Sequence, residues 1–267
     1  MRTWSSILFL ITALAHSTAG QVPSATQTSN AREERRQTYL QLSRGVFAGP
    51  QEPPDVLRRV ANLPAAQVDG ITEQLHNLLV AEIGDVLAGP NPTAQDVVQS
   101  LQRLLGETSI SEWDAQSSNT PFAEFVELNG ARTLAVSYGI LRSGGALPNT
   151  HSYFEFYAPE NGAWQLKTHA NLEFDRCTFF ISSMDAGSPG RAWFLAWGKV
   201  FGDTGSRLRL RLYAFDGTSV KTIWQRDGLS AGLVTVSRKS VSLEYDKEYR
   251  SPERMHETLY PSSDGLR

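Results

Sequence analysis

Apolar side chains recur at helical spacing in the first half of the chain. Between Gln67 and Ala88 they fall three or four residues apart, and Gly89-Pro90 ends the pattern. The spacing therefore predicts a helix over 67–88 with one apolar face. Its apolar positions are Val68, Ile71, Leu75, Leu78, Leu79, Ile83, Val86 and Leu87.

The same spacing predicts a second helix over 94–105. Thr93 can cap its start, and Asp96 lies in its first turn, near the positive end of the helix dipole. Because the connection between the two helices is short, we expect an antiparallel helical hairpin. The apolar stripe consists of Val97, Val98, Leu101, Leu104 and Leu105, and Gly106 closes it.

A shorter helix is predicted ahead of these two. The segment from Ala31 has a charged first half, then apolar residues, and a stop at Gly45. A Pro-rich break follows over 49–54. The helical region as a whole is therefore expected to span 31–108, followed by a linker over 109–120.

From about Pro121 the period changes from helical to alternating, which is typical of half-buried strands, and it stays so until about Tyr249. Asn129-Gly130 suits a two-residue type I′ turn and would place Glu127 opposite Arg132. The fold class expected is α+β: a small helical region followed by an antiparallel meander of about eight to ten strands over 121–250.

The hairpin over 208–224 has a strictly alternating first strand. A three-residue loop, Phe215-Asp216-Gly217, with Gly217 left-handed, would pair Leu212 with Val220 and Leu208 with Trp224. This register keeps one strand face apolar, whereas a two-residue turn would bury Lys221. The arginines of the first strand, Arg207, Arg209 and Arg211, then project together from the other face.

The β region also contains an internal repeat. Residues 137–169 align with 196–228, with Tyr157-Ala158 matching Tyr213-Ala214, and each copy with its following strand makes about four strands. In this respect the segment 133–245 resembles two blades of a β-propeller. Because propellers close with about four to eight blades, two copies cannot close one alone. Two packed sheets or an up-and-down barrel are equally compatible with the repeat.

The N-terminus predicts export. Arg2, an apolar core over 7–15 and small residues before Gln21 are typical of a signal peptide over 1–20. A flexible lead-in over 21–30 and a C-terminal tail over 251–267 complete the expected organisation. No other apolar run approaches the ~18 residues of a membrane-spanning helix, so we expect a soluble mature chain with no membrane span after signal cleavage.

Composition narrows the class of protein. The only cysteine, Cys177, can form no intramolecular disulfide, and no Asn-x-Ser/Thr acceptor is present, which favours a bacterial periplasmic or secreted protein. With 25 Lys and Arg against 28 Asp and Glu, the charge does not indicate nucleic-acid binding.

Candidate catalytic groups are sparse. Glu173 with Asp175, and Glu244 with Asp246, each place two carboxylates on one strand face, as a glycosidase could use. Outward polar residues on half-buried strands explain them more simply. Cys177 on or beside a strand is expected to be a core residue rather than a nucleophile.

The histidines form no recognisable catalytic or metal-binding pattern. His76 lies beside an apolar stripe and is expected at a surface or boundary position. His151, His169 and His256 have no spacing that implies a catalytic triad. No metal-ligand spacing occurs, and no cofactor is expected.

The arginine face is the candidate binding site. Three neighbouring guanidinium groups need anionic partners, and we expect internal acids such as Glu155 or Glu244 in preference to an external anion such as an acidic glycan. Trp193 and Trp197 could form a sugar platform but are expected in the core.

The function expected is that of an exported, non-catalytic binding or scaffold protein, with an anionic glycan or another exported protein as its partner. Two alternatives stay open. One is a secreted hydrolase acting on a glycan or ester, and the other is a β-barrel that holds an apolar ligand.

Overall fold

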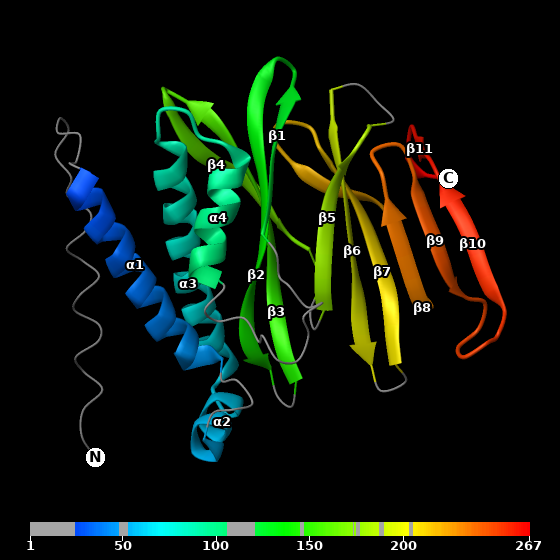
Figure 1. Ribbon diagram of the computed structural model, residues 1–267, viewed down its shortest axis with the longest axis horizontal. Coiled ribbons are helices and arrows are strands. Elements are labelled where there is room, and N and C mark those ends of the chain that lie inside the picture. The colour runs from blue at the N-terminus through cyan, green and yellow to red at the C-terminus, as the bar shows by residue number, and fades with distance from the viewer. Residues whose placement is uncertain are drawn as a thin grey trace.

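The computed structural model describes residues 25–47, 53–105, 121–144, 147–172, 174, 177–186, 190–202 and 205–267. They form three layers: helices cover one face of a four-stranded sheet, sheet A, and a six-stranded sheet, sheet B, packs on its other face (Figure 1). The predicted α+β fold with an antiparallel meander is confirmed.

The helical layer contains α1 (Ala25–Val46), α2 (Pro54–Ala61), α3 (Ala65–Leu87) and α4 (Ala94–Leu105). Sheet A contains, in order, β1 (Phe122–Leu128), β2 (Ala131–Gly144), β3 (Leu147–Glu160) and β4 (Ala163–Asn171). Sheet B contains, in order, β10 (Arg254–Leu259), β9 (Val241–Asp246), β8 (Val220–Val236), β7 (Gly205–Phe215), β6 (Ala192–Gly202) and β5 (Cys177–Met184). The short strands β11 (Pro261–Ser262) and β12 (Gly265–Leu266) pair with each other.

The helices α3 and α4 match their predicted ranges. Val97 and Leu101 of α4 are fully buried, as the apolar stripe predicted. The start of α4 is capped reciprocally, because the Asp96 backbone N–H donates to Thr93 Oγ1 at 3.1 Å and the Thr93 hydroxyl donates to the Asp96 carboxylate at 2.7 Å.

Two helical segments differ from the sequence-based expectation. Residues 25–30, expected to be flexible, belong to α1, which the Arg35–Asp85 ion pair (2.7 Å) and the buried Tyr39 hold against the other helices. The Pro-rich stretch predicted only a break, but α2 begins at its end. Pro54 stands in the first turn of α2, where the N–H that proline lacks would have no helical acceptor. The predicted signal peptide lies outside the described residues, and none of the described helices has the length and apolar character to cross a membrane.

Tight turns set the register of sheet A. Asn129 and Gly130 have φ of 52° and 77°, as a type I′ turn requires, and Glu127 faces Arg132 as predicted. Asn161 and Gly162 repeat this geometry between β3 and β4, with φ of 52° and 82°.

The strands are grouped differently from the predicted repeat. The resemblance to propeller blades grouped residues 178–182 with the first unit, whereas β5 pairs with β6 in sheet B. Sheet A therefore contains β1–β4 and sheet B contains β5–β10, and the two sheets pack face to face. Both sheets are open, with edge strands β1, β4, β5 and β10 among the described residues.

The predicted register of the β7–β8 hairpin is wrong. The loop contains four residues, Asp216 to Ser219, and Phe215 pairs with Val220. The Asp216 carboxylate accepts the Thr218 and Ser219 backbone N–H groups at 2.9 and 2.8 Å, which closes the longer loop. A bulge near Ile223 absorbs the extra residue, so Leu212 faces Trp224 and the leucines stay buried. Gly217 has a φ of +99°, which confirms its predicted left-handed conformation.

Sheet B curls because β8 bends. The first half of β8 pairs with β7 and the second half with β9, with register shifts between them. Gly232 permits the bend, since a Cβ at this position would lie 2.6 Å from Leu208 Cβ. The curl encloses a third apolar core, to which Leu243 of β9 and Leu259 of β10 contribute. Strand β10 lies within 251–267, which was expected to be only a tail.

Replacing Leu101 by Ala should lower the free energy of unfolding by about 2 to 5 kcal/mol, because the side chain is fully buried between helices and sheet A. Chemical unfolding measures the change, and Gln102→Ala on the exposed side of α4 is the matched control. Equal stability of the two variants would contradict the described packing.

Candidate functional site

Two arginines of the β7 face, Arg209 and Arg211, pair within the sheet with an acid that the sequence did not single out. Arg211 holds Asp227 of β8 through two hydrogen bonds, at 2.6 and 2.9 Å, and Arg209 Nε lies 3.4 Å from the same carboxylate. These contacts lower the pKa of Asp227, chiefly through the hydrogen bonds from Arg211. The proposed acids, Glu155 and Glu244, are engaged elsewhere. The bulges of β8 place Asp227 here, and they could not be located from the sequence.

Exposure rises along this face of β7. The Arg211 side chain is 6% exposed and that of Arg209 28%, while Arg207 lies on the surface. Arg211 is therefore a structural residue, and only the Arg207 end can meet a ligand from solvent.

The most buried acidic residue among those described is Glu155 of β3, whose carboxylate lies between α3 and sheet A. Its Oε1 accepts the Tyr138 hydroxyl at 2.9 Å and lies 2.5 Å from His76 Nε2, while Oε2 accepts the Tyr157 hydroxyl at 2.6 Å. Glu155 is 0% exposed and the His76 side chain 14%. The His76 ring stacks on Tyr153, with 4.2 Å between ring centroids. We call Glu155, His76, Tyr138, Tyr153 and Tyr157 the Glu155 cluster.

Local structure explains how these groups meet. Tyr153, Glu155 and Tyr157 alternate along β3 and so share one face, and Tyr138 faces Tyr153 from β2. Burial, together with the adjacent Glu155 carboxylate, raises the pKa of Tyr138 and of Tyr157 well above the usual value. Both hydroxyls therefore remain hydrogen-bond donors, and the carboxylate is surrounded by donors. His76, expected as a boundary histidine, is the contact from α3.

The remaining catalytic candidates fall in different parts of the structure. Glu244 and Asp246 both contact Arg254, at 3.0 and 2.9 Å, which agrees with the simpler interpretation of this pair. Glu173, Asp175 and the Cys177 side chain lie outside the described parts of the structure. Two of the histidines lie beside the Glu155 cluster: His169 pairs with Glu155 across β3 and β4, with its ring centroid 6.1 Å from that of His76, and the His151 ring centroid lies 4.7 Å from that of Tyr153. His256 lies on β10 of sheet B. The described residues contain no group of three or more His, Cys, Asp or Glu side chains arranged to hold a metal ion.

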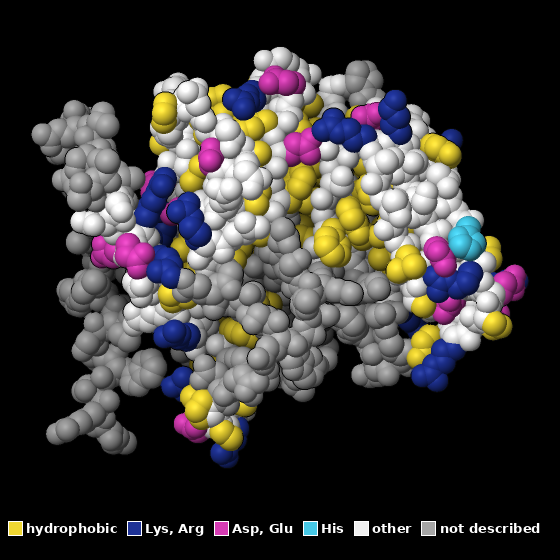
Figure 2. All heavy atoms as spheres, viewed as in Figure 1, with side chains coloured by type: hydrophobic (Ala, Val, Ile, Leu, Met, Phe, Trp, Pro, Cys, Tyr) yellow, Lys and Arg dark blue, Asp and Glu magenta, His cyan; other side chains and the backbone are white. Residues whose placement is uncertain are grey.

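The two tryptophans differ in environment. Trp193 is 1% exposed and belongs to the core, as expected. Trp197 is only partly buried and stacks on Phe180, which is 43% exposed, with 5.7 Å between ring centroids. Figure 2 shows hydrophobic side chains gathered on the surface over β5 and β6.

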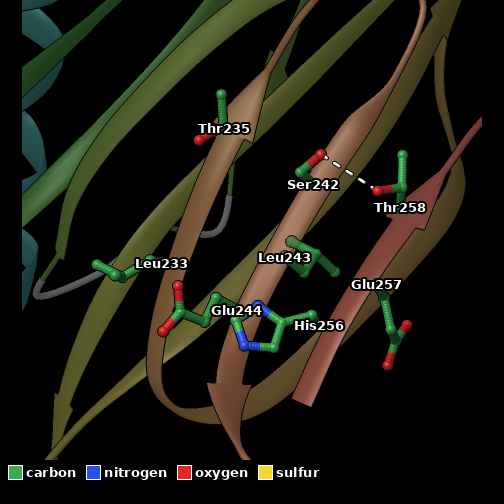
Figure 3. A pocket seen from close by; sticks show the side chains of 8 residues that line it. All are labelled: Leu233, Thr235, Ser242, Leu243, Glu244, His256, Glu257 and Thr258. Carbon is green, nitrogen blue, oxygen red and sulfur yellow. Dashed lines mark hydrogen bonds between the residues drawn. The ribbon is translucent and has the colours of Figure 1, made fainter. Parts of the chain in front are cut away.

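A shallow groove of about 350 Å³ lies on the outer face of the curled half of sheet B (Figure 3). Strand pairing arranges its exposed side chains in two rows, each of which crosses β8, β9 and β10. The residues of the first row are Leu233, Glu244 and His256, and those of the second are Thr235, Ser242 and Thr258. Sequence reasoning noted Glu244 and His256 separately, but only the register of β8 with β9 brings them beside Leu233 and the hydroxyls.

The groove combines several kinds of side chain on three regularly paired strands. The Ser242 and Thr258 hydroxyls lie 3.4 Å apart, so each keeps hydrogen-bonding capacity for another group. Glu257 turns to the other side of β10 and pairs with Arg226 at 2.5 and 2.8 Å. The usable side chains are therefore three hydroxyls, one carboxylate, one imidazole and one leucine.

Comparison with protein-family models, with curated proteins and with solved structures finds no match, so the site is interpreted from its own geometry.

The raised pKa values of Tyr138 and Tyr157 predict a loss of stability in alkali. In the unfolded chain these tyrosines ionise near pH ~10, whereas in the folded chain they resist ionisation. Their stabilising contribution is therefore fully present below pH ~10 and falls as the pH rises above it.

Urea unfolding between about pH 8 and pH 11 measures this effect. Tyr157→Phe should lose less stability over this range than the unmodified chain. The control Tyr260→Phe, at a position 59% exposed, should follow the unmodified chain. A Tyr157→Phe curve parallel to the unmodified one would contradict the described cluster.

Proposed function

We propose that the chain is an exported, non-catalytic binding protein whose ligand is a saccharide held in the groove of β8, β9 and β10. The observation that carries the proposal is the pair of side-chain rows in this groove, which combine hydroxyl, carboxylate, imidazole and aliphatic groups. Its volume of about 350 Å³ falls in the range of small-ligand sites, about 300 to 1,000 Å³. Export rests on the N-terminal sequence alone.

The chemistry of the groove favours a saccharide. A sugar ring carries many hydroxyls, which both donate and accept, and patches of C–H that pack on apolar side chains. Thr235, Ser242 and Thr258 offer hydrogen bonds of both kinds, and Leu233, 53% exposed, offers an apolar surface. An apolar ligand would leave these hydroxyls without water or partners, which is unfavourable.

The arrangement of the acids supports binding rather than hydrolysis. A glycosidase needs two carboxyl groups on opposite sides of the scissile bond, one of them protonated. Glu244 and Asp246 instead share one guanidinium, that of Arg254, on a single strand face. The Glu155 carboxylate is enclosed under α3 and has no exposed surface.

The double variant Thr235→Val/Thr258→Val tests the proposal. It keeps side-chain shape but removes two exposed hydroxyls, so we expect oligosaccharide affinity to fall at least about tenfold while stability stays unchanged. Isothermal titration calorimetry against a panel of neutral and acidic oligosaccharides measures the affinity.

Thr222→Val is the matched control, because Thr222 is an exposed β8 residue away from the groove. It should bind like the unmodified chain. Failure of every oligosaccharide in the panel to bind the unmodified chain would overturn the proposed function.

A further inference from the structure

The groove and the exposed end of the arginine face lie on the same face of sheet B. Strand pairing sets Arg207 of β7 opposite Ser230 of β8, Ser230 opposite Asp246 of β9, and Asp246 opposite Arg254 of β10. Residues paired across antiparallel strands project from the same side of the sheet. One row of side chains therefore runs from Arg207 to Arg254.

This row is directly adjacent to the groove. Glu244, in the first groove row, lies two residues from Asp246 on β9, and His256 lies two residues from Arg254 on β10. Residues two apart along a strand share a face and are about 7 Å apart. The Arg207 row is therefore a third row on the same face of sheet B, and it lies next to the first groove row.

The surface is electrically polarised along this direction. At the β7 end, Asp227 pairs with Arg209 and Arg211, whereas the exposed Arg207 is not in contact with it. At the β9 end, the single guanidinium of Arg254 forms ion pairs with both Glu244 and Asp246. Arg207 therefore adds a positive charge that no described carboxylate pairs with, while two carboxylates share one guanidinium beside the groove.

Along this row, a small residue lies between the two ends. Ser230, between them, is a small residue with 8% exposure, and Arg254 reaches across it to the Ala231 carbonyl of β8 at 3.4 Å. Arg207 is exposed, while Arg209 remains partly accessible beside it. An extended ligand can lie over Ser230 and contact both regions.

We infer that the ligand is an acidic oligosaccharide that binds in one orientation. Its neutral hydroxyls lie in the groove, and a carboxylate or sulfate at one end meets Arg207, with Arg209 beside it. This inference rests on the proposed function and adds the charge and direction of the ligand. A guanidinium pairs with either oxyanion through parallel N–H donors, so both belong to the same chemistry.

Arg207→Gln tests the inference, because Arg207 is exposed and the variant should fold normally. The probes are a neutral oligosaccharide that ends in one uronic acid, its neutral methyl ester, and an oligosaccharide of equal length that ends in one sulfated sugar. Titration calorimetry at low and high salt should show at least about a fivefold loss of affinity for the acidic probe that binds, with little change for the ester. The salt dependence of acidic binding should also fall in the variant.

The control Lys221→Gln makes the same change in net charge at an exposed position in β8, near the β7–β8 turn. It should bind every probe like the unmodified chain. Arg207→Gln with unchanged binding of an acidic probe, or Lys221→Gln with an equal loss, would overturn the inference while the proposed function stands. No binding of any probe by the unmodified chain would overturn both. Preference for one acidic probe distinguishes carboxylate from sulfate recognition.

Discussion

The Glu155 carboxylate has no exposure to solvent, so the side chains around it must supply its hydrogen-bond partners. A buried carboxyl group is tolerated only where hydrogen-bond partners replace water. Glu155 obtains these contacts from both layers that enclose it: Tyr138 and Tyr157 donate from sheet A, and His76 approaches from α3. The position of α3 on the sheet is therefore fixed by a directional polar contact as well as by apolar packing.

The packing of sheet A between two other layers follows from the same alternation along β3. Glu155 and Tyr157 face the helices, whereas Phe154 and Phe156 face sheet B. Phe156 stacks on Phe215 with 3.9 Å between ring centroids, and the Phe154 and Phe194 ring centroids are 5.0 Å apart. One strand thus directs a polar cluster to one side and an aromatic core to the other. The curled half of sheet B carries the groove on its outer face.

The sequence could predict those parts of the fold that local patterns determine. The helices α3 and α4 and the Asn129-Gly130 turn follow from apolar spacing and turn chemistry within a few residues. The β7–β8 register failed because the Asp216 side chain closes a longer loop and a bulge near Ile223 restores the apolar face. Neither effect leaves a periodic signal in the sequence.

The candidate site was less predictable, since its parts are distant along the chain. His76 and Glu155 are 79 residues apart, and the groove depends on the bend of β8 at Gly232. The arginine alternation was visible in the sequence, but its acid, Asp227, reaches Arg211 only through the shifted pairing. Polar residues are brought together by tertiary structure, which composition and spacing do not encode locally.

The central claim is that the Glu155 cluster stabilises the packing of α3 on sheet A, and that ligands bind in the groove of β8, β9 and β10. A double-mutant cycle with His76→Ala and Glu155→Gln, read by both urea unfolding and oligosaccharide titration, tests it most directly. We expect a coupling free energy of at least about 1 kcal/mol in stability and an unchanged affinity for oligosaccharide. Additive stability effects, or a stable Glu155→Gln variant that no longer binds, would contradict the claim.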